Sequence, residues 1–313
     1  MVLPGSDSAI LRIKGTRKAI ALTCDGNGRY CYLDPYEGGK IAVAEAARNV
    51  VCSGAKPLAI TNCLNFGNPT KPQIFWQFRR CVEGMASSCR ALDTPVTGGN
   101  VSFYNENPNG AIDPTPVVGM LGLLEDIGLR CTPYFKNEGD LVILLGEFGQ
   151  DLGGSEYLKV IHNLKVGRPP RLNLEKEKAV QKTCLEAIEE GLVNSAHDCS
   201  EGGLAVALAE CCISNPEERI GAFIDLSPFT SHVSRVTVSA LLFGETQSRI
   251  IISCHPKNFA RIKEIAGKNK SSFLKLGKVG GDSLVIFANG KELINIKVDE
   301  LNRIWRNSLP RRL

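Results

Sequence analysis

The sequence predicts an α/β (α+β) protein made of two successive units. Short apolar stretches alternate with amphipathic stretches of helical period along most of the chain, which is typical of α/β folds. The 313 residues are 43% hydrophobic, which is enough to build two cores. The pattern breaks around residues 127–136. We therefore expect one domain over residues 1–130 and a second over residues 131–313.

The first unit begins with a strand over 18–24, followed by polar turns at 25–28 and 33–39. A helix is predicted for 40–52, because its apolar residues recur at helical spacing and Gly54 can cap its end.

The rest of this unit contains two strands, a helix and a glycine-containing stretch. A short strand at 57–61 leads into an amide-rich loop over 62–69, and a long amphipathic helix over 72–92 has proline in its first turn. Residues 94–102 (TPVTGGNVS) are expected to form a short strand that ends in Gly98 and Gly99. An apolar strand over 116–124 closes the unit.

The second unit repeats this alternation. Its predicted elements are strands at 140–145, 195–198 and 248–254, helices at 174–190, 203–212 and 257–266, a hairpin of 284–287 and 293–298, and a short C-terminal helix. Asn173 is the expected N-cap of the helix over 174–190, Gly267 the expected stop of the helix over 257–266, and Asn289-Gly290 the hairpin turn.

Composition excludes several classes of protein. The net charge is +4, without a basic block interleaved with aromatics, so we expect no nucleic-acid partner. No apolar run reaches membrane-spanning length and residues 1–5 do not resemble a signal peptide, so we expect no membrane association. Many of the twelve cysteines lie inside apolar patterns, which predicts buried reduced thiols and a cytoplasmic location (Cys52, Cys81, Cys89, Cys184, Cys211, Cys212, Cys254).

The stretch 94–102 is the strongest candidate for ligand binding. Gly98 and Gly99 lack Cβ atoms, so a ligand can approach their backbone closely. Asn100 and Ser102 alternate as on one face of an extended strand, and offer an amide oxygen and a hydroxyl. This combination suits a phosphorylated ligand with its magnesium ion, although a Gly-Gly pair alone is more often an ordinary turn.

Several long stretches together resemble phosphoribosylformylglycinamidine synthase, in particular the C-terminal half of its small-form synthetase subunit. They are DPYEGGKIAVAEAARNV, ITNCLNFGNP, TPVTGGNVSFYNE, GQDLGGSEY, AHDCSEGGLAVALAE and LFGETQSR. The resemblance implies an A domain, similar to aminoimidazole ribonucleotide synthetase, whose sheet pairs with a second A domain in a pseudo-dimer, followed by a B domain.

The resemblance also implies an ATP-dependent ligase reaction that forms a C–N bond. Formylglycinamide ribonucleotide is activated by ATP and Mg²⁺, and ammonia from a separate glutaminase subunit converts it to the amidine. The implied protein partners are the N-terminal half of the same enzyme, the glutaminase subunit and a small assembly subunit.

The resemblance assigns four site residues. Asn62 and Gly99 match ATP contacts, Asn100 matches a magnesium ligand, and Ser102 matches a substrate contact. Many members have aspartate at the position of Asn62, so a metal role for Asn62 is open, and a loop amide bonded to its own backbone is the alternative. The family's histidine motif has no match here, because His162, His197, His232 and His255 all lie in the second unit. We therefore expect no catalytic residue in this segment, and no activity from the segment alone.

Duplication in the family implies a second nucleotide site, holding a nucleotide that is not turned over. The candidates are Asp25, Asn27, Asp34, Glu37, Asp198, Glu201 and Gly202-Gly203, with a solvated turn as the alternative for Asp34 and Glu37. Two other functions stay open: a non-catalytic scaffold that holds a nucleotide and docks partner subunits, or a related ATP-dependent synthetase of the same fold.

Overall fold

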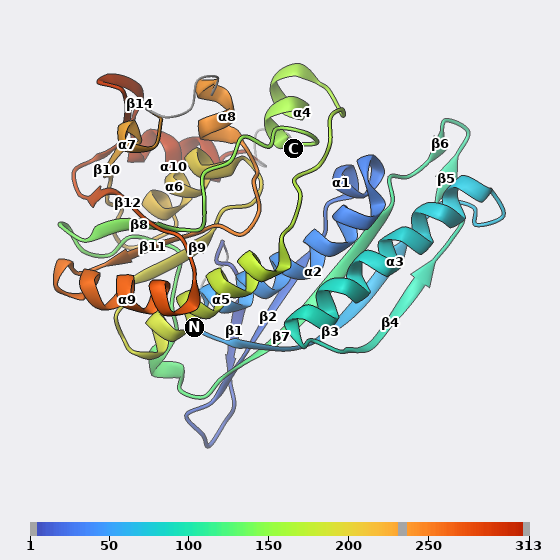
Figure 1. Cartoon of the computed structure of the whole chain (residues 1–313), viewed down its shortest axis with the longest axis horizontal. Helices are drawn as coiled ribbons and strands as arrows, with labels where there is room; N and C mark the ends of the chain where they lie inside the picture. The colour runs from blue at the N-terminus through green and yellow to red at the C-terminus, as the bar shows by residue number, and fades with distance from the viewer. Residues whose placement is uncertain (1–4, 231–236, 309–313) are drawn as a thin grey trace.

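Two β-sheets organise the protein, one from each part of the chain (Figure 1). The computed structural model describes residues 5–230 and 237–308. The elements of the first part are β1 (Ala9–Arg12), β2 (Ala19–Asp25), α1 (Gly28–Leu33), α2 (Pro35–Cys52), β3 (Lys56–Asn65), α3 (Pro72–Leu92), β4 (Val96–Ser102), β5 (Glu106–Asn107), β6 (Gly110–Ala111) and β7 (Thr115–Leu124).

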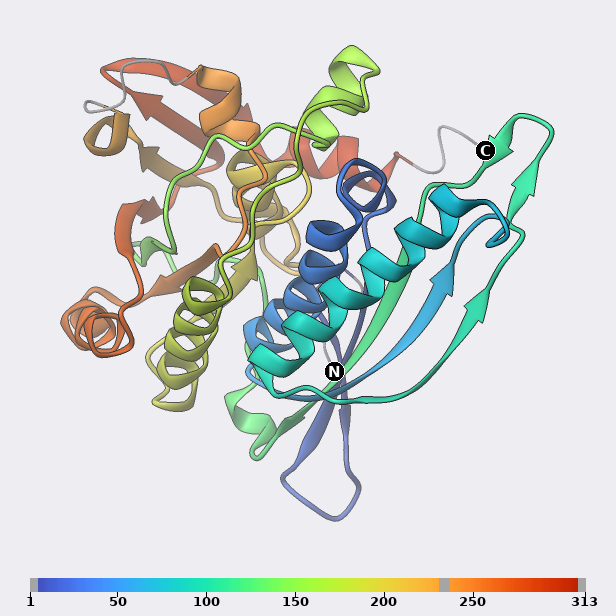
Figure 2. The same cartoon turned by 45° about the vertical axis from the view of Figure 1, so that its right-hand side comes forward.

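The first sheet has five strands in the order β1-β2-β7-β3-β4, with only β3 and β4 parallel. Helices α2 and α3 lie side by side across one face (Figures 1 and 2). Ile60, Val118 and Met120 belong to the core beneath them. The opposite face carries no helix from the described part of the chain, and leaves Leu22 and Leu58 more than a third exposed.

The second sheet has seven strands in the order β14-β13-β10-β12-β8-β11-β9. Its strands are β8 (Leu141–Leu145), β9 (Ser195–Asp198), β10 (Ala222–Asp225), β11 (Ile250–Cys254), β12 (Phe273–Val279), β13 (Ser283–Ala288) and β14 (Lys291–Lys297). Its helices are α4 (Glu156–His162), α5 (Leu174–Glu189), α6 (Gly203–Ile213), α7 (Ser227–Thr230), α8 (Val238–Phe243), α9 (Phe259–Asn269) and α10 (Val298–Arg306). One core packs with α5 and α9, and another with α6, α8 and α10, so both faces of this sheet are covered.

Most long periodic segments agree with the sequence predictions. The helix over 72–92 has the predicted bounds, Asn173 caps α5 through bonds from Glu175 N and Lys176 N, and β13 and β14 form the predicted antiparallel hairpin. Strands β1, β10 and β12 were not predicted. No strand of either sheet crosses residue 130.

The predicted turn over 33–39 is wrong. Asp34 caps α2 by accepting bonds from Tyr36 N and Glu37 N, so the helix begins at Pro35. The glycines in this stretch serve packing: a Cβ on Gly39 would lie 2.4 Å from the Cys81 carbonyl oxygen of α3. On α3, a Cβ on Gly84 would lie 2.1 Å from the Tyr36 carbonyl oxygen, so these glycines let the two helices approach closely.

Three other local predictions are also wrong. Asn62 lies within β3 rather than in a loop, and Gly98 and Gly99 lie within β4 rather than at its end. In both cases pairing between neighbouring strands extends the strand beyond its apolar residues. Gly267 lies inside α9, which ends at Asn269 with Lys270 in the left-handed conformation.

The predicted burial of free cysteines is confirmed. All twelve are free, and the seven singled out in apolar patterns are buried. Among the described residues, none of the helices is long and apolar enough to cross a membrane.

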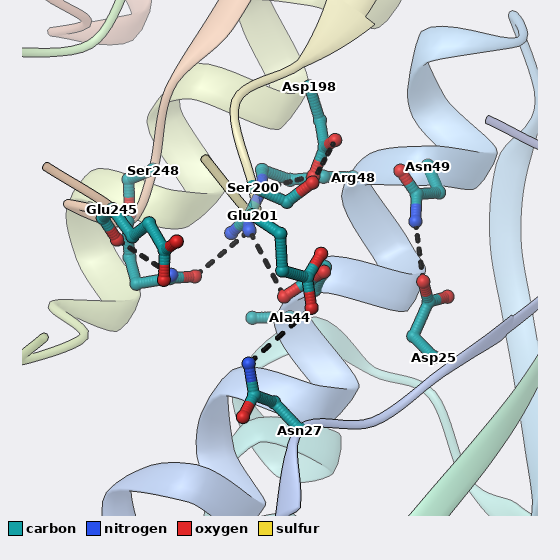
Figure 3. Close-up of polar contacts among 12 residues, drawn as sticks. Asp25, Asn27, Ala44, Arg48, Asn49, Asp198, Ser200, Glu201, Glu245 and Ser248 are labelled. Carbon is teal, nitrogen blue, oxygen red and sulfur yellow. Dashed lines mark hydrogen bonds and ion pairs between the residues drawn. The ribbon is translucent and has the colours of Figure 1, made fainter. Parts of the chain in front are cut away.

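A buried arginine joins the two parts of the protein (Figure 3). Arg48 of α2 is fully buried, and its Nη1 lies 3.0 Å from both carboxylate oxygens of Glu177 on α5. Its Nη2 donates to Gln247 Oε1 at 2.9 Å, and its Nε donates to Asp198 Oδ2 at 3.4 Å. Burial opposes the charge, but Glu177, Asp198 and Glu45 together raise the pKa of Arg48, so the guanidinium stays charged.

The pairing of β3 with β4 depends on a glycine. Asn62 is the direct partner of Gly99 across this parallel pair. A Cβ on Gly99 would lie 2.2 Å from Asn62 Oδ1 and 2.5 Å from its carbonyl oxygen, whereas a Cβ on Gly98 would have no heavy atom within 4 Å. The Asn62 side chain therefore lies over Gly99 and fills the space that a Cβ atom would occupy in any other residue.

Replacing Arg48 with methionine is expected to lower the free energy of unfolding by about 3–5 kcal/mol, because Glu177 would remain buried without its cation. The control is Arg79→Met, which removes an exposed partner of Glu83 on α3 and is expected to cost less than about 1 kcal/mol. Urea denaturation of the three proteins measures both values. Equal losses in the two variants would contradict the structural role of Arg48.

Replacing Gly99 with alanine is expected to cost about 1–3 kcal/mol, because the Asn62 carbonyl oxygen belongs to the backbone and cannot move without disturbing β3. Gly98→Ala is the matched control, with an expected change of at most about 0.5 kcal/mol. Thermal and urea unfolding test the pair. A Gly99 variant as stable as the Gly98 variant would show that the close approach is not required.

Candidate functional site

The predicted ligand residues lie together at the open edge of the first sheet. In the pairing of β4 with β3, Gly99 lies beside Asn62, Asn100 beside Cys63, and Ser102 beside Asn65. Asn100 is exposed and Ser102 is half-buried. Because side chains alternate along a strand, Asn100 and Ser102 share one face of β4, and Gly99 faces the other way.

A shallow hollow of about 400 Å³ lies on the first sheet beside these residues, and β2, β7, β3 and β4 all contribute to its lining. It is lined by Cys24, Thr61, Asn62, Cys63, Gly99, Asn100, Val117 and Gly119. Three of the four predicted site residues therefore line one hollow. Ser102 lies next to it along β4, and its Oγ donates to Asn105 Oδ1 at 3.3 Å.

The lining of this hollow is neutral. Its side-chain oxygens include those of Asn100 and Thr61, and none of its lining residues is a carboxylate. The Asn62 side chain lies over Gly99, on the other face of the strands. An amide oxygen is a suitable but uncharged ligand for Mg²⁺. These residues fit a magnesium ion only together with a ligand that brings negative charge, such as the phosphates of ATP.

A second cluster of polar residues lies beside Arg48, where α2 meets the second sheet (Figure 3). Asp25 Oδ1 accepts a bond from Asn49 Nδ2 at 2.7 Å, and Asn27 Nδ2 donates to Glu201 Oε1 at 3.4 Å. Asp198 binds Arg48 and also accepts from Ser200 Oγ at 3.2 Å. The cluster therefore combines residues from both parts of the chain.

The carboxyl groups of this cluster raise one another's pKa. Burial raises the pKa of Asp25 to about 7, with further contributions from Asp198 and Glu201. Burial also raises the pKa of Asp198 to about 6, with a further contribution from Asp7. The pKa of Glu45 is raised well above its ordinary value by burial and by the charges of Glu201 and Asp198. Such a concentration of buried carboxylates is relieved by a bound cation.

Sequence reasoning found part of this cluster. It identified Asp25, Asn27, Asp198 and Glu201, which the structure brings together. Asp34 and Glu37 lie elsewhere: Asp34 caps α2, and Glu37 binds Lys40 and the backbone nitrogen of Leu172.

The residues that sequence reasoning missed lie on α2. Glu45, Arg48 and Asn49 have the spacing i, i+3 and i+4, which places them on one helix face within an otherwise apolar run. A sequence signal could have identified them. Polar side chains at this spacing fall on the apolar face of the helix instead of on its solvated face.

Glu245 accepts hydrogen bonds from three segments that surround the cluster. Its Oε1 accepts bonds from Gly202 N and Glu156 N, both at 2.8 Å, and its Oε2 accepts a bond from the Tyr30 hydroxyl of α1. Gly203 begins α6 with φ of +68°, and a Cβ there would lie 2.5 Å from the Gly244 carbonyl oxygen. This loop therefore requires glycine and is fixed to both parts of the chain.

Among the described histidines, His197 is not a free base, because both of its ring nitrogens contact carboxylates. His197 Nδ1 lies 2.7 Å from Asp7 Oδ1, and its Nε2 lies 3.1 Å from Glu210 Oε2. Although burial lowers it, these two carboxylates hold the pKa of His197 well above its ordinary value. Asp7, His197 and Asp198 also bring three possible metal-ligand atoms within 4.8 Å, but both ring nitrogens are already engaged. His232 lies outside the described residues.

Comparison with known proteins identifies the two parts of the chain. Residues 5–124 match the family described as AIR synthase related protein, N-terminal domain, and residues 137–288 match the corresponding C-terminal domain. The sequence is 54% identical over 98% of the chain to the phosphoribosylformylglycinamidine synthase subunit PurL of Moorella thermoacetica, and 49% identical over 99% to that of Alkaliphilus metalliredigens. The chain spans 41% of the length of each of these relatives.

Solved structures agree on the fold. T. maritima PurL complexed with FGAR matches 96% of this chain and 48% of its own, with a TM-score of 0.79 and 18% identity. AaThiL complexed with AMPPCP and TMP matches 94% of this chain and 91% of its own, with a TM-score of 0.63 and 17% identity. The predicted AIR synthetase-like fold is confirmed. The chain therefore belongs to the AIR synthase related proteins, and within them it is similar to the PurL subunit of phosphoribosylformylglycinamidine synthase.

Proposed function

We propose that this chain is a functional module of an ATP-dependent formylglycinamidine ribonucleotide synthase. The module acts in the conversion of formylglycinamide ribonucleotide and ammonia to the amidine, a step of purine biosynthesis. The observation that carries the proposal is the 54% identity to PurL along nearly the whole chain. The open edge of β3 and β4, where the residues matching the family's ligand contacts lie together, supports it.

Each residue at this edge has a role in the proposal. Gly99 offers backbone to the nucleotide, Asn62 orients it, Asn100 gives an oxygen ligand to Mg²⁺, and Ser102 donates a hydrogen bond to the anionic ribonucleotide. Bound Mg²⁺ neutralises the charge of the transferring phosphoryl group. Because phosphoryl transfer depends on positioning and charge neutralisation, no nucleophile is required from these residues.

The remaining parts of the site come from partners. The open face of the first sheet, which exposes Leu22 and Leu58, suits pairing with a second sheet of the same kind, as the family resemblance implies. The N-terminal half of the enzyme is that partner in our proposal, and a glutaminase and a small assembly subunit complete the assembly. A solved assembly titled PurLQS from Thermotoga maritima contains a chain of this fold, with a TM-score of 0.74. The proposal also places the chain in the cytoplasm, where its free thiols stay reduced.

The test is a chimera in which this chain replaces the matching segment of Moorella thermoacetica PurL. Asn100→Ala is expected to lower ammonia-dependent ATP hydrolysis by about a hundredfold, because the cation loses a protein ligand. The matched control is Asn295→Ala, which changes an exposed asparagine on β14, the edge strand of the second sheet. The control is expected to keep full activity.

Either of two results would overturn the proposal. An Asn100 variant with unchanged turnover would remove the residue from the site. A folded chimera that retains nucleotide tightly but never hydrolyses it would favour the scaffold function instead.

We further propose that the carboxylates beside Arg48 hold a cation and a retained nucleotide. The buried or half-buried carboxyl groups of Asp25, Glu45 and Asp198, together with the more exposed Glu201, raise one another's pKa there, which supports binding of positive charge. The amide of Asn49 adds a neutral ligand next to Asp25. Hard oxygen ligands of this kind suit Mg²⁺.

Asp25→Asn is expected to weaken binding of ADP with Mg²⁺ to the isolated chain by about tenfold, because one of the charges that attract the cation is lost. Glu125→Gln, at an exposed residue that pairs with Lys18, is the control and should bind as the unaltered chain does. Isothermal titration calorimetry measures both. No binding to the unaltered chain, or equal binding in the two variants, would refute the second site.

A further inference from the structure

A separate cavity lies at the end of the second sheet, between the N-terminal end of α5 and the loop that follows α9. Its volume is about 210 Å³. It is lined by Gly146, Glu147, Phe148, Arg171, Asn173, Lys176, Val180, Thr246, Gln247, Ser248, Lys270, Ser271 and Ser272. None of these residues belongs to the hollow at the edge of the first sheet.

The charge of this cavity is positive. Lys176 lies 2.6 Å from Glu147, so these two charges balance each other. Arg171 and Lys270 also line the cavity, and neither makes an ion pair with any residue in 5–230 or 237–308. The two cations come from different segments, one before α5 and one after α9. Both are exposed residues, and their charges add in the cavity, which therefore attracts an anion.

Hydrogen-bond donors surround the same space. Asn173 Oδ1 accepts bonds from Glu175 N and Lys176 N, which leaves its Nδ2 group as a donor. Ser271 and Ser272 add two hydroxyls, which make only long bonds of 3.2 and 3.4 Å to the Ser272 carbonyl oxygen and to Glu147. Two cations together with several weakly engaged donors are suited to an oxyanion with several oxygens.

We propose that this cavity binds a phosphoryl group, as inorganic phosphate or as the phosphate of a small phosphomonoester. The two cations in its lining match the charge of a phosphate dianion, and the amide and hydroxyl donors match its additional oxygens. The volume is below the range of about 300–1,000 Å³ that larger ligands occupy, which favours a small ligand over a whole nucleotide.

The floor of the cavity connects it to the contact between the two parts of the protein. Gln247 accepts the bond from Arg48 Nη2, and Ser248 Oγ donates to Glu177 Oε2 at 2.5 Å. A ligand held above these two residues restrains the groups that bind Arg48. Binding of a ligand in the cavity is therefore expected to stabilise the folded chain against thermal unfolding.

The experiment compares two double variants that lose the same charge. Arg171→Gln with Lys270→Gln removes the two cavity cations. Lys182→Gln with Lys268→Gln removes two exposed cations that lie near Glu186 on the same side of the protein, outside the cavity. Titration of inorganic phosphate and of glycerol phosphate, each at constant ionic strength, is followed by calorimetry and by the midpoint of thermal unfolding.

The cavity variant is expected to bind phosphate about a hundredfold more weakly than the unaltered chain, since each lost charged contact costs about tenfold. The control variant is expected to bind within about twofold of the unaltered chain, because it retains both cavity cations. Tighter binding of glycerol phosphate would identify a phosphomonoester as the ligand, and tighter binding of phosphate would identify the free ion.

Two outcomes would overturn the assignment. The first is an equal loss of affinity in both double variants, which would indicate attraction to a diffuse positive surface. The second is the absence of any phosphate-dependent heat or thermal shift in the unaltered chain. Because the two cations lie far along the sequence from Asn100, neither outcome depends on whether the proposed synthase activity is present.

Discussion

The contact of Arg48 with Glu177 is the interaction on which the arrangement of the two sheets depends. Both side chains are fully buried, so the ion pair forms only when α2, α5 and the strand that ends at Asp198 meet in one geometry. Removing two charges from water is costly, and the additional bonds from Gln247 and Ser248 offset part of that cost. A buried ion pair with this many partners specifies one orientation between the two parts. The same orientation brings Asp25 near Asp198.

Close packing between α2 and α3 extends that constraint to the open edge of the first sheet. Gly39 and Gly84 face carbonyl oxygens of the opposite helix, so the two helices lie close together across the sheet. At that edge Gly99 leaves the space that the Asn62 side chain occupies. At these positions glycine acts by omitting a side chain where two backbones meet.

The elements that could be predicted from the sequence are those that depend on periodicity or on turn residues. The helix over 72–92 and the hairpin at Asn289-Gly290 follow from periodicity and turn chemistry, and the structure reproduces them. Gly98 and Gly99 were placed at a strand end because glycine usually interrupts strands, whereas pairing with β3 decides the outcome. Strand β10 was missed because its four residues are stabilised by neighbours distant in the sequence. In the candidate site, alternation and the family resemblance predict Asn100 and Ser102, but no local pattern predicts Glu45, which lies within an apolar helix.

The two polar sites differ in whether the protein itself supplies the negative charge that holds a cation. This difference suits the two sites to different functions. The hollow beside Asn100 offers only neutral oxygens, so a cation there is held chiefly by the ligand that carries it and leaves with that ligand. The cluster around Asp25 and Asp198 supplies an excess of buried carboxylate, so a cation there is held by the protein itself. An enzyme must release its bound ligand and cation after each turnover, whereas a structural ligand must stay bound. In the function that we propose, the neutral hollow is therefore the site of repeated ATP binding and release, and the acidic cluster is the site that retains a nucleotide.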